Sequence, residues 1–200
     1  MVKKGDRINN PITGETIIFQ QTAKDTAGSL LQFNFLIKPG GFVAAPHIHP
    51  IQEERFLVKS GTIRLRVGEN EQLLSTGQEG VVPAGTPHML WNGGEDEAQA
   101  LVEFRPALRI QDELSTLFAL ARGGLTDNKG MPNLLQTAVT IRKYRSEIYL
   151  AKPPVAVQKV LFAVLAPIGR LFGYQADPQP CPDERNARPG ILESPHYSGC

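Results

Sequence analysis

The chain has 200 residues, of which 41% are hydrophobic and 20% are charged, and its formal net charge at pH 7 is +1. This near-neutral balance excludes the strongly basic face that is typical of nucleic-acid-binding proteins, so we expect no nucleic-acid partner. The length suits one domain with an appendage or two small domains, and it is sufficient to bury a sizeable core.

The ends of the chain predict a cytoplasmic protein. The first ten residues, MVKKGDRINN, contain no apolar segment of the kind that forms a secretory signal peptide. The uncharged, largely apolar run Val160–Gly169 is about half as long as a membrane-spanning helix, so we expect no membrane partner. Cys181 and Cys200 both lie close to the C-terminus and form no disulfide framework through the chain.

Residues 1–106 are predicted to form a β domain, because short runs rich in Val, Ile, Leu and Phe alternate with Gly, Pro and Asn. Apolar and charged residues alternate within Thr62–Val67, and Ser60–Gly61 predicts a tight hairpin turn before it. Many short, evenly spaced strands are typical of a closed barrel or a jelly roll. The predicted strands are Thr16–Gln20, Leu30–Ile37, Phe42–His49, Glu54–Lys59, Thr62–Val67, Glu71–Leu74, Glu79–Val82, His88–Asn92 and Ala98–Arg105.

Residues 107–174 are predicted to form a helical extension that packs on the barrel or on a partner subunit. Apolar residues recur at helical spacing over residues 110–121, and Gly123–Gly124 is a suitable C-terminal cap. A second helix is expected after Pro132–Asn133, extending to Ile148.

A third helix is predicted from Pro153–Pro154 onward, with Pro167 expected to kink it or to end it early. Residues 175–200 are rich in Pro, Asp and Arg and predict a poorly ordered tail. One broad face of the third helix is apolar and is expected to be the packing face. It comprises Val157, Val160, Leu161, Val164, Leu165, Ile168, Leu171 and Phe172.

Three of the four histidines lie in two short segments of the β region. His47 and His49 are two residues apart, so on a strand both side chains point to the same face. Glu54 opens the next predicted strand, and His88 opens another after the turn at residues 83–85. If the sheet closes, these four side chains can converge on one point in the interior.

Three imidazoles and one carboxylate suit one divalent transition metal, either Fe, Mn, Ni, Cu, Co or Zn. No cysteine lies in either segment, which excludes a thiolate zinc site there. Four protein ligands leave up to two positions of an octahedral ion open, as a catalytic or substrate-binding metal requires. The alternative is a set of structural histidines that hold no metal.

The two segments resemble the paired motifs of the cupin superfamily, over about residues 28–106. They follow the patterns G-x5-H-x-H-x4-E-x6-G and G-x5-P-x-G-x2-H-x3-N, with every fixed position present. The fixed positions are Gly41, His47, His49, Glu54 and Gly61, then Gly77, Pro83, Gly85, His88 and Asn92. The resemblance implies an all-β core, namely a double-stranded β-helix (jelly-roll) barrel of the RmlC-like type, followed here by a C-terminal α-helical extension.

The resemblance also implies roles for individual residues. His47, His49, Glu54 and His88 would be the metal ligands inside the mouth of the barrel, and Asn92 would be structural. Glu53 and Glu54 are adjacent and face opposite ways on a strand. The motif spacing selects Glu54, whereas a β-bulge that shifted the register would select Glu53.

The arginines of the β region are expected to be surface charges. Arg64 and Arg66 share the solvated side of one strand. Arg55 and Arg105 have the alternative role of binding a substrate carboxylate.

Two functions are compatible with the pattern. The first is a mononuclear metal-dependent enzyme that acts on a small organic molecule in a dioxygenase-, isomerase- or decarboxylase-like reaction, with redox chemistry open to Fe, Mn, Ni or Cu and not to Zn. The second is a non-catalytic module that senses a small molecule or a metal. It ranks lower because a sensor of transcription would need a basic DNA-binding surface. After Pro106 the chain has only a short basic cluster, formed by Arg142, Lys143 and Arg145. We also expect a homodimer, because cupin barrels commonly pair and the third helix is apolar.

Overall fold

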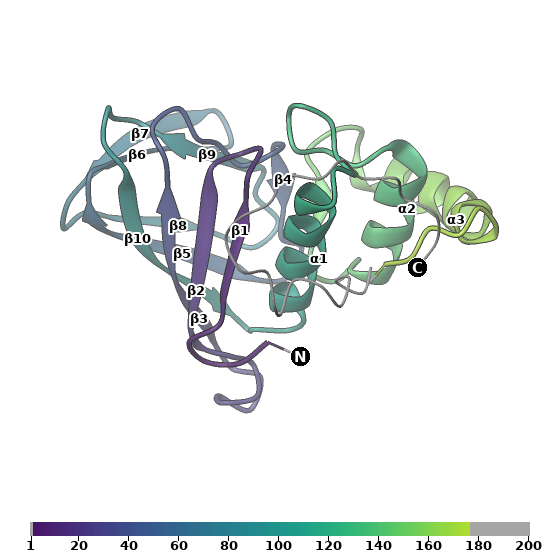
Figure 1. Ribbon diagram of the computed structural model, residues 1–200, viewed down its shortest axis with the longest axis horizontal. Coiled ribbons are helices and arrows are strands. Elements are labelled where there is room, and N and C mark those ends of the chain that lie inside the picture. The colour runs from purple at the N-terminus through teal and green to yellow at the C-terminus, as the bar shows by residue number, and fades with distance from the viewer. Residues whose placement is uncertain (1, 177–200) are drawn as a thin grey trace, which may run out of the picture.

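The computed structural model describes residues 2–176, which form two antiparallel sheets followed by a helical part (Figure 1). The predicted tail, apart from Gln175 and Ala176, and both cysteines lie outside the described residues. The strands are β1 (Arg7–Asn10), β2 (Glu15–Gln21), β3 (Leu31–Ile37), β4 (His47–Ile48), β5 (Glu53–Ser60), β6 (Thr62–Val67), β7 (Asn70–Ser75), β8 (Glu79–Val82), β9 (His88–Asn92), β10 (Ala98–Arg105) and β11 (Tyr149–Leu150). The helices are α1 (Ile110–Arg122), α2 (Leu134–Lys143) and α3 (Val155–Leu171).

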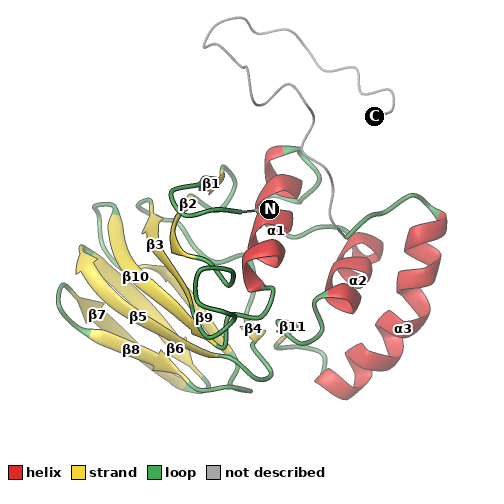
Figure 2. Cartoon of the chain, turned by 90° about the horizontal axis from the view of Figure 1, so that it is seen from below, coloured by secondary structure: helices red, strands yellow, loops and turns green. Residues whose placement is uncertain are grey.

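The two sheets form the predicted jelly-roll sandwich. One sheet has the strand order β1-β2-β3-β10-β5-β8 and the other has the order β11-β4-β9-β6-β7. The sheets lie on one side of the molecule, and α1 stands between them and the pair α2 and α3 (Figures 1 and 2). The cavity described below lies between the sandwich and the helical part.

Period-two alternation builds the core of the sandwich. Along β3 every second side chain is buried, beginning at Leu31 and ending at Ile37. Ile63 and Leu65 of β6 point inward from the other sheet, whereas Arg64 between them is exposed, as predicted. Each buried aliphatic or aromatic side chain stabilises the fold by roughly 1.5–3 kcal/mol, so the register of these strands is strongly determined.

The predicted strand Phe42–His49 is wrong in its first part. Only His47–Ile48 is a strand, and Phe42 forms an isolated bridge with Trp91. Pro46 has no N–H to donate to a ladder, and it restricts the residue before it, which explains why pairing begins only after it.

Two strands were not predicted. β1 has the largely polar sequence RINN and pairs with β2 at the edge of its sheet, and β11 is two residues long and pairs with β4. Neither carries an alternating pattern of useful length. Because β11 lies between α2 and α3, the helical part of the chain contributes a strand beside His47.

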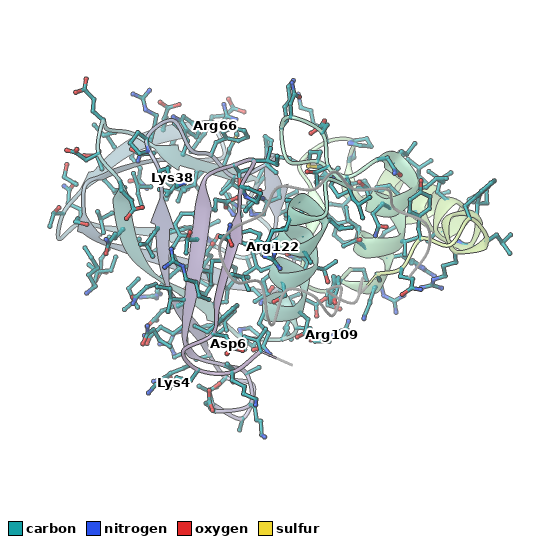
Figure 3. The ribbon with its side chains drawn as sticks, viewed as in Figure 1. Lys4, Asp6, Lys38, Arg66, Arg109 and Arg122 are labelled. Atoms are coloured by element: carbon teal, nitrogen blue, oxygen red, sulfur yellow. The ribbon has the colours of Figure 1, made fainter. Side chains whose placement is uncertain are left out.

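The first helix agrees with its prediction, and the second is shorter. α1 is tied to the sandwich by Arg122, whose guanidinium donates to the Asn9 carbonyl oxygen at 3.0 Å (Figure 3). α2 begins at the cap Asn133, whose side chain accepts from the Gln136 N–H at 3.0 Å. It ends at Lys143 and not at Ile148, because the chain turns there to form β11.

The third helix differs from its prediction in the face that it buries. It continues through Pro167 to Leu171, so the proline does not end it. The carbonyl left without a donor would be that of Ala163, an exposed residue, where water can satisfy it. The predicted packing face is mostly exposed, while Gln158, Phe162, Ala166 and Gly169 are buried.

Small residues explain this choice of face. A Cβ at Gly169 would stand 2.7 Å from Cγ2 of Val139 in α2, so the two helices approach more closely than a larger residue allows. Gln158 is 0% exposed, and its amide donates to the Leu150 and Pro153 carbonyls at 2.7 and 2.6 Å.

Within residues 2–176, no helix has both the length and the apolar character needed to cross a membrane.

Asn92 provides a test of the link between the two sheets. Its amide donates to the carbonyls of Ile37 and Asp96 at 2.9 and 2.8 Å and accepts from the Gly94 N–H at 2.8 Å. We expect Asn92→Ala to lower the free energy of unfolding by about 2 kcal/mol, because buried backbone groups lose their partners. Urea unfolding measures the loss as a lower midpoint at an unchanged slope. Asn70→Ala, at an exposed position, is the control, and equal midpoints for the two variants would contradict this role.

Candidate metal centre

Four side chains from both sheets meet in the interior. His47 lies in β4 and pairs in register with His88 of β9, which brings two rings within 4.2 Å of each other, centroid to centroid. His49 follows β4, and Glu54 projects from β5 of the other sheet. One ligand atom from each of the four residues can be chosen so that all lie within 4.8 Å of one another.

Backbone carbonyls orient the three rings. The Nδ1 atoms of His47, His49 and His88 lie 2.9, 2.7 and 3.0 Å from the carbonyl oxygens of Ala45, Glu147 and Thr86. A carbonyl only accepts, so each Nδ1 carries the proton and each Nε2 presents a lone pair. This arrangement is the one that metal-ligating histidines use.

Several polar atoms in this cluster have no partner. His49 Nε2, His88 Nε2 and Glu54 Oε2 are all buried without a hydrogen bond. His88 Nε2 and Glu54 Oε2 are 2.9 Å apart, close enough for an ion pair when His88 is protonated. Buried atoms left in this state cost about 1–3 kcal/mol each, and a divalent cation shared by them would remove that cost.

Electrostatics keep two of the rings neutral. Burial, with the neighbouring His88 acting in the same direction, lowers the pKa of His49 to about 3. Burial also lowers the pKa of His47 well below its ordinary value of 6.5. For His88 burial acts in the same sense, but the Glu54 carboxylate outweighs it and the pKa of His88 is raised. At neutral pH a metal ion would therefore compete mainly with a proton on His88.

The structure brings Glu54, and not Glu53, to the cluster. Glu53 forms an ion pair at 2.6 Å with the exposed Arg55 on the outer side of β5. Arg105 pairs with Glu103, and Arg64 pairs with Glu71, both at the surface. None of these arginines lines the cavity, so the alternative role in binding a substrate carboxylate has no support among the described residues.

A cavity of about 110 Å³ connects the cluster with the helical part. Its wall is largely apolar and comes from the sandwich on one side and from α1 and α2 on the other. The apolar lining includes Ile17, Phe33, Phe35, Phe56, Leu90, Val102, Phe104, Ile110, Leu114, Leu117 and Phe118. His47, His49, Glu54 and His88 all reach this cavity, so a ligand inside it would lie beside the metal centre.

Three buried carboxylates were missed by the sequence analysis. Glu113 of α1 and Glu15 of β2 both line the cavity. Burial raises the pKa of Glu113 to about 8, with Glu147 and Glu15 acting in the same direction, and burial raises the pKa of Glu15 to about 7. A signal existed for Glu113, because it stands three residues after Ile110 within the apolar stripe of its helix.

Glu147 connects the helical part to the cluster. Its backbone carbonyl accepts from His49, and its carboxylate accepts from Nε of Arg109 at 3.2 Å, at the start of α1 (Figure 3). The helical extension, to which the sequence analysis gave no role, therefore sets the orientation of one candidate ligand.

Several solved structures resemble this chain over about half of its length, whereas no curated protein matches it. The chain is similar to TT1209 from Thermus thermophilus, with 27% identity over 51% of this chain and 90% of that one and a TM-score of 0.42. It is also similar to a predicted oxalate decarboxylase from Thermotoga maritima (17% identity, 53% and 99% covered, TM-score 0.46) and to an RmlC-like cupin from Shewanella frigidimarina (15%, 54% and 89%, 0.46).

The sequence model of the family described as "Cupin domain" matches residues 33–104. This range contains the four clustered residues and both motifs, within the jelly-roll sandwich. The resemblance found in the sequence is therefore confirmed, and the chain contains a domain of the cupin superfamily.

Proposed function

We propose that this cupin domain binds one divalent transition metal through His47, His49, Glu54 and His88 and acts as a mononuclear metal-dependent enzyme on a small organic molecule. One observation carries the proposal: four ligand atoms lie within 4.8 Å of one another, and three buried polar atoms of this group have no hydrogen-bond partner. The residue types fit Fe, Mn, Ni, Cu, Co or Zn.

Different residues of the chain have different roles at such a site. The three carbonyls at residues 45, 86 and 147 hold the imidazoles in the tautomer that presents Nε2. Glu54 supplies the single negative charge that offsets part of the charge of a divalent ion. A metal held here supplies Lewis-acid chemistry and, for a redox metal, electron transfer, so dioxygenase-, isomerase- and decarboxylase-like reactions all belong to the proposal.

The cavity sets the size of the substrate. At about 110 Å³ it is smaller than the usual range for drug-sized ligands, and its largely apolar wall offers few polar partners to water. A small molecule with a metal-binding oxygen and a largely apolar body fits these walls.

The second candidate is a non-catalytic sensor of a metal or a small molecule. It is favoured by the contact between His49 Nδ1 and the Glu147 carbonyl at 2.7 Å, because this contact couples the centre to the segment between α2 and β11. Turnover of a substrate distinguishes an enzyme from a sensor, which binds its ligand without forming product. A cytoplasmic setting and the lack of nucleic-acid and membrane partners stay predictions from composition.

Elemental analysis tests the metal centre. We expect about one transition-metal ion per chain in protein purified without added metal, and a content at least about tenfold lower in Glu54→Gln and His88→Ala, because each removes one of four ligands. Glu53→Gln is the matched control and should retain the ion. The wild-type protein should also melt at a higher temperature with the metal than after chelation. Equal metal content in Glu53→Gln and Glu54→Gln would refute the assignment.

The affinity for the metal should depend on pH. The pKa of His88 is raised, so a proton competes for its Nε2 near neutrality, whereas His49, with a pKa of about 3, is already neutral. We therefore expect the apparent affinity to fall by about tenfold per pH unit once the pH drops below the raised pKa of His88. Competition with a chelator of known affinity at pH 8, 7 and 6 measures this slope. An affinity that is constant over this range would contradict the protonation of His88.

A further inference from the structure

The cavity has a second polar end, formed by Glu113. This residue of α1 is 4% exposed and lines the cavity, together with the four residues of the metal centre. Its carboxylate has no hydrogen-bond or ion-pair partner among residues 2–176. A buried carboxyl group that faces an apolar cavity without a partner is expensive to maintain unless a ligand uses it.

The surroundings of Glu113 are acidic. Glu15 of β2 also lines the cavity and is 5% exposed, with its Oε2 accepting from the Thr13 hydroxyl at 2.5 Å. Glu147 is 2% exposed, and its carboxylate forms an ion pair with Arg109. Glu15 and Glu147 act electrostatically on Glu113, so three carboxyl groups share this region, and Arg109 pairs with Glu147 among them.

We infer that Glu113 and Glu15 form an acidic subsite that binds the amino group of a small, largely apolar amine. The inference rests on the proposed function only in placing the other end of this ligand at the metal centre. An ammonium group presents three N–H donors and one positive charge to the two carboxyl groups. As it binds, it displaces the proton held by Glu113, which passes to solvent water, so the ion pair forms with balanced charge.

Other ligand types fit this end of the cavity less well. A carboxylate would add a further negative charge to a region of low dielectric constant, where repulsion is strong. A hydroxyl group can donate only one hydrogen bond and forms no ion pair with either carboxyl group. The cavity volume of about 110 Å³ is close to that of sites that hold a single benzene ring, which sets the size of a suitable probe.

Calorimetric titration with three probes of similar size tests this subsite. Benzylamine, benzyl alcohol and benzoate are each titrated at pH 7 into the metal-loaded protein and into the metal-free protein. We expect benzylamine to bind about tenfold or more tightly than benzyl alcohol, with release of a proton seen as a dependence of the heat on the buffer. In the metal-free protein, where its carboxylate has no metal to bind, we expect benzoate to bind most weakly. Glu113→Gln should weaken benzylamine binding about tenfold and leave benzyl alcohol unchanged.

Asp112→Asn is the matched control. It replaces a carboxyl group by an amide in the same helical turn, but Asp112 does not line the cavity, so the affinity for benzylamine should stay at the wild-type value. Equal affinities for benzylamine and benzyl alcohol, no benzylamine binding, or full benzylamine affinity in Glu113→Gln would overturn the inference. Binding through a metal–nitrogen bond, which disappears in metal-free protein and ignores Glu113→Gln, would also overturn it.

Failure of this inference can be told apart from failure of the proposed function. If the protein holds no metal but benzylamine binds in a Glu113-dependent manner, the proposed metal centre fails and the subsite stands. If the metal binds stoichiometrically and benzylamine shows no preference, only the subsite fails.

A separate observation concerns the outer face of α3. Seven apolar side chains on or just after this helix are exposed. The sum of their exposed fractions corresponds to about four fully exposed side chains, or an apolar surface area on the order of 600 Å². They are Val157 (50%), Val160 (70%), Leu161 (37%), Val164 (59%), Ile168 (38%), Leu171 (87%) and Phe172 (74%). This area is at the upper limit of apolar patches on monomeric proteins.

The spacing of these residues favours a second helix as the occupant. Val157, Val164 and Leu171 are seven residues apart, and Val160 lies between the first two at heptad spacing. The two exposed cations of the helix, Lys159 and Arg170, lie outside this face, on the side of Ala163. We propose that the α3 face, defined by the seven side chains above, pairs with the α3 face of a second copy of this chain.

The area supports this choice of occupant. A stable interface needs about 800 Å² from each partner, and Ala156, Ala163 and Pro167, which are also exposed on α3, extend the face toward that value. The face contains no charge, so two copies can meet about a twofold axis without repulsion. An interfacial membrane helix would instead carry many basic residues along its polar side.

Sedimentation equilibrium at micromolar concentration tests the pairing. We expect a mass of about twice 21.9 kDa for the wild-type chain and a monomer for Val164→Glu, whose charge would be buried at the centre of the interface. Leu125→Glu, at another exposed apolar residue, is the control and should stay dimeric. A monomeric wild-type chain overturns the proposal. This holds if the α3 face then binds lipid vesicles, and it also holds if the chain forms dimers only after residues 177–200 are removed. A dimeric Val164→Glu chain overturns it as well.

Discussion

The orientation of three imidazole rings by backbone carbonyls is the interaction on which the centre depends. Each carbonyl fixes a proton on Nδ1. The Nε2 atoms of His49 and His88 then lie 3.7 and 2.9 Å from Oε2 of Glu54. Two of these carbonyls, at residues 45 and 86, lie two residues before the histidine they orient, so the local chain path supplies them. The third, at Glu147, comes from the helical part of the chain.

This difference explains how much of the site could be predicted from the sequence. His47, His49, Glu54 and His88 could be predicted because period-two geometry and a doubled motif relate them to their own strands. The choice of Glu54 over Glu53 depended on register, which buried neighbours on both sides determine. The contact between His49 and Glu147 spans 98 residues, and no local pattern encodes such a contact.

The helical part shows a second limit of reasoning from periodicity. A helical wheel identifies the most apolar side of a helix, and the analysis assumed that this side faces the core. In α3 the buried side instead has two of the smallest residues, Ala166 and Gly169, and the polar Gln158. Close approach to α2 and the hydrogen bonds of Gln158, which donates two and accepts one, outweigh the burial of larger apolar side chains. Local propensity correctly predicted that the helix exists, but tertiary packing decided which face it buries.

The metal centre and Glu113 both place unpaired polar groups in the interior, and both line the same cavity. At the metal centre, buried lone pairs face one point without a donor, and at Glu113 a buried carboxyl group faces the cavity without a partner. A core selected only for stability would replace such groups by apolar side chains of similar volume, because an unpaired polar group costs more than its hydrogen bonds return. Both groups are held by elements that are otherwise well packed, since Phe104 lies against His49 and Phe118 follows Glu113 on α1. The surrounding core therefore offsets the free-energy cost of burying unpaired polar groups at two ends of one cavity. Ligands bound at both ends would provide the missing partners and remove that cost.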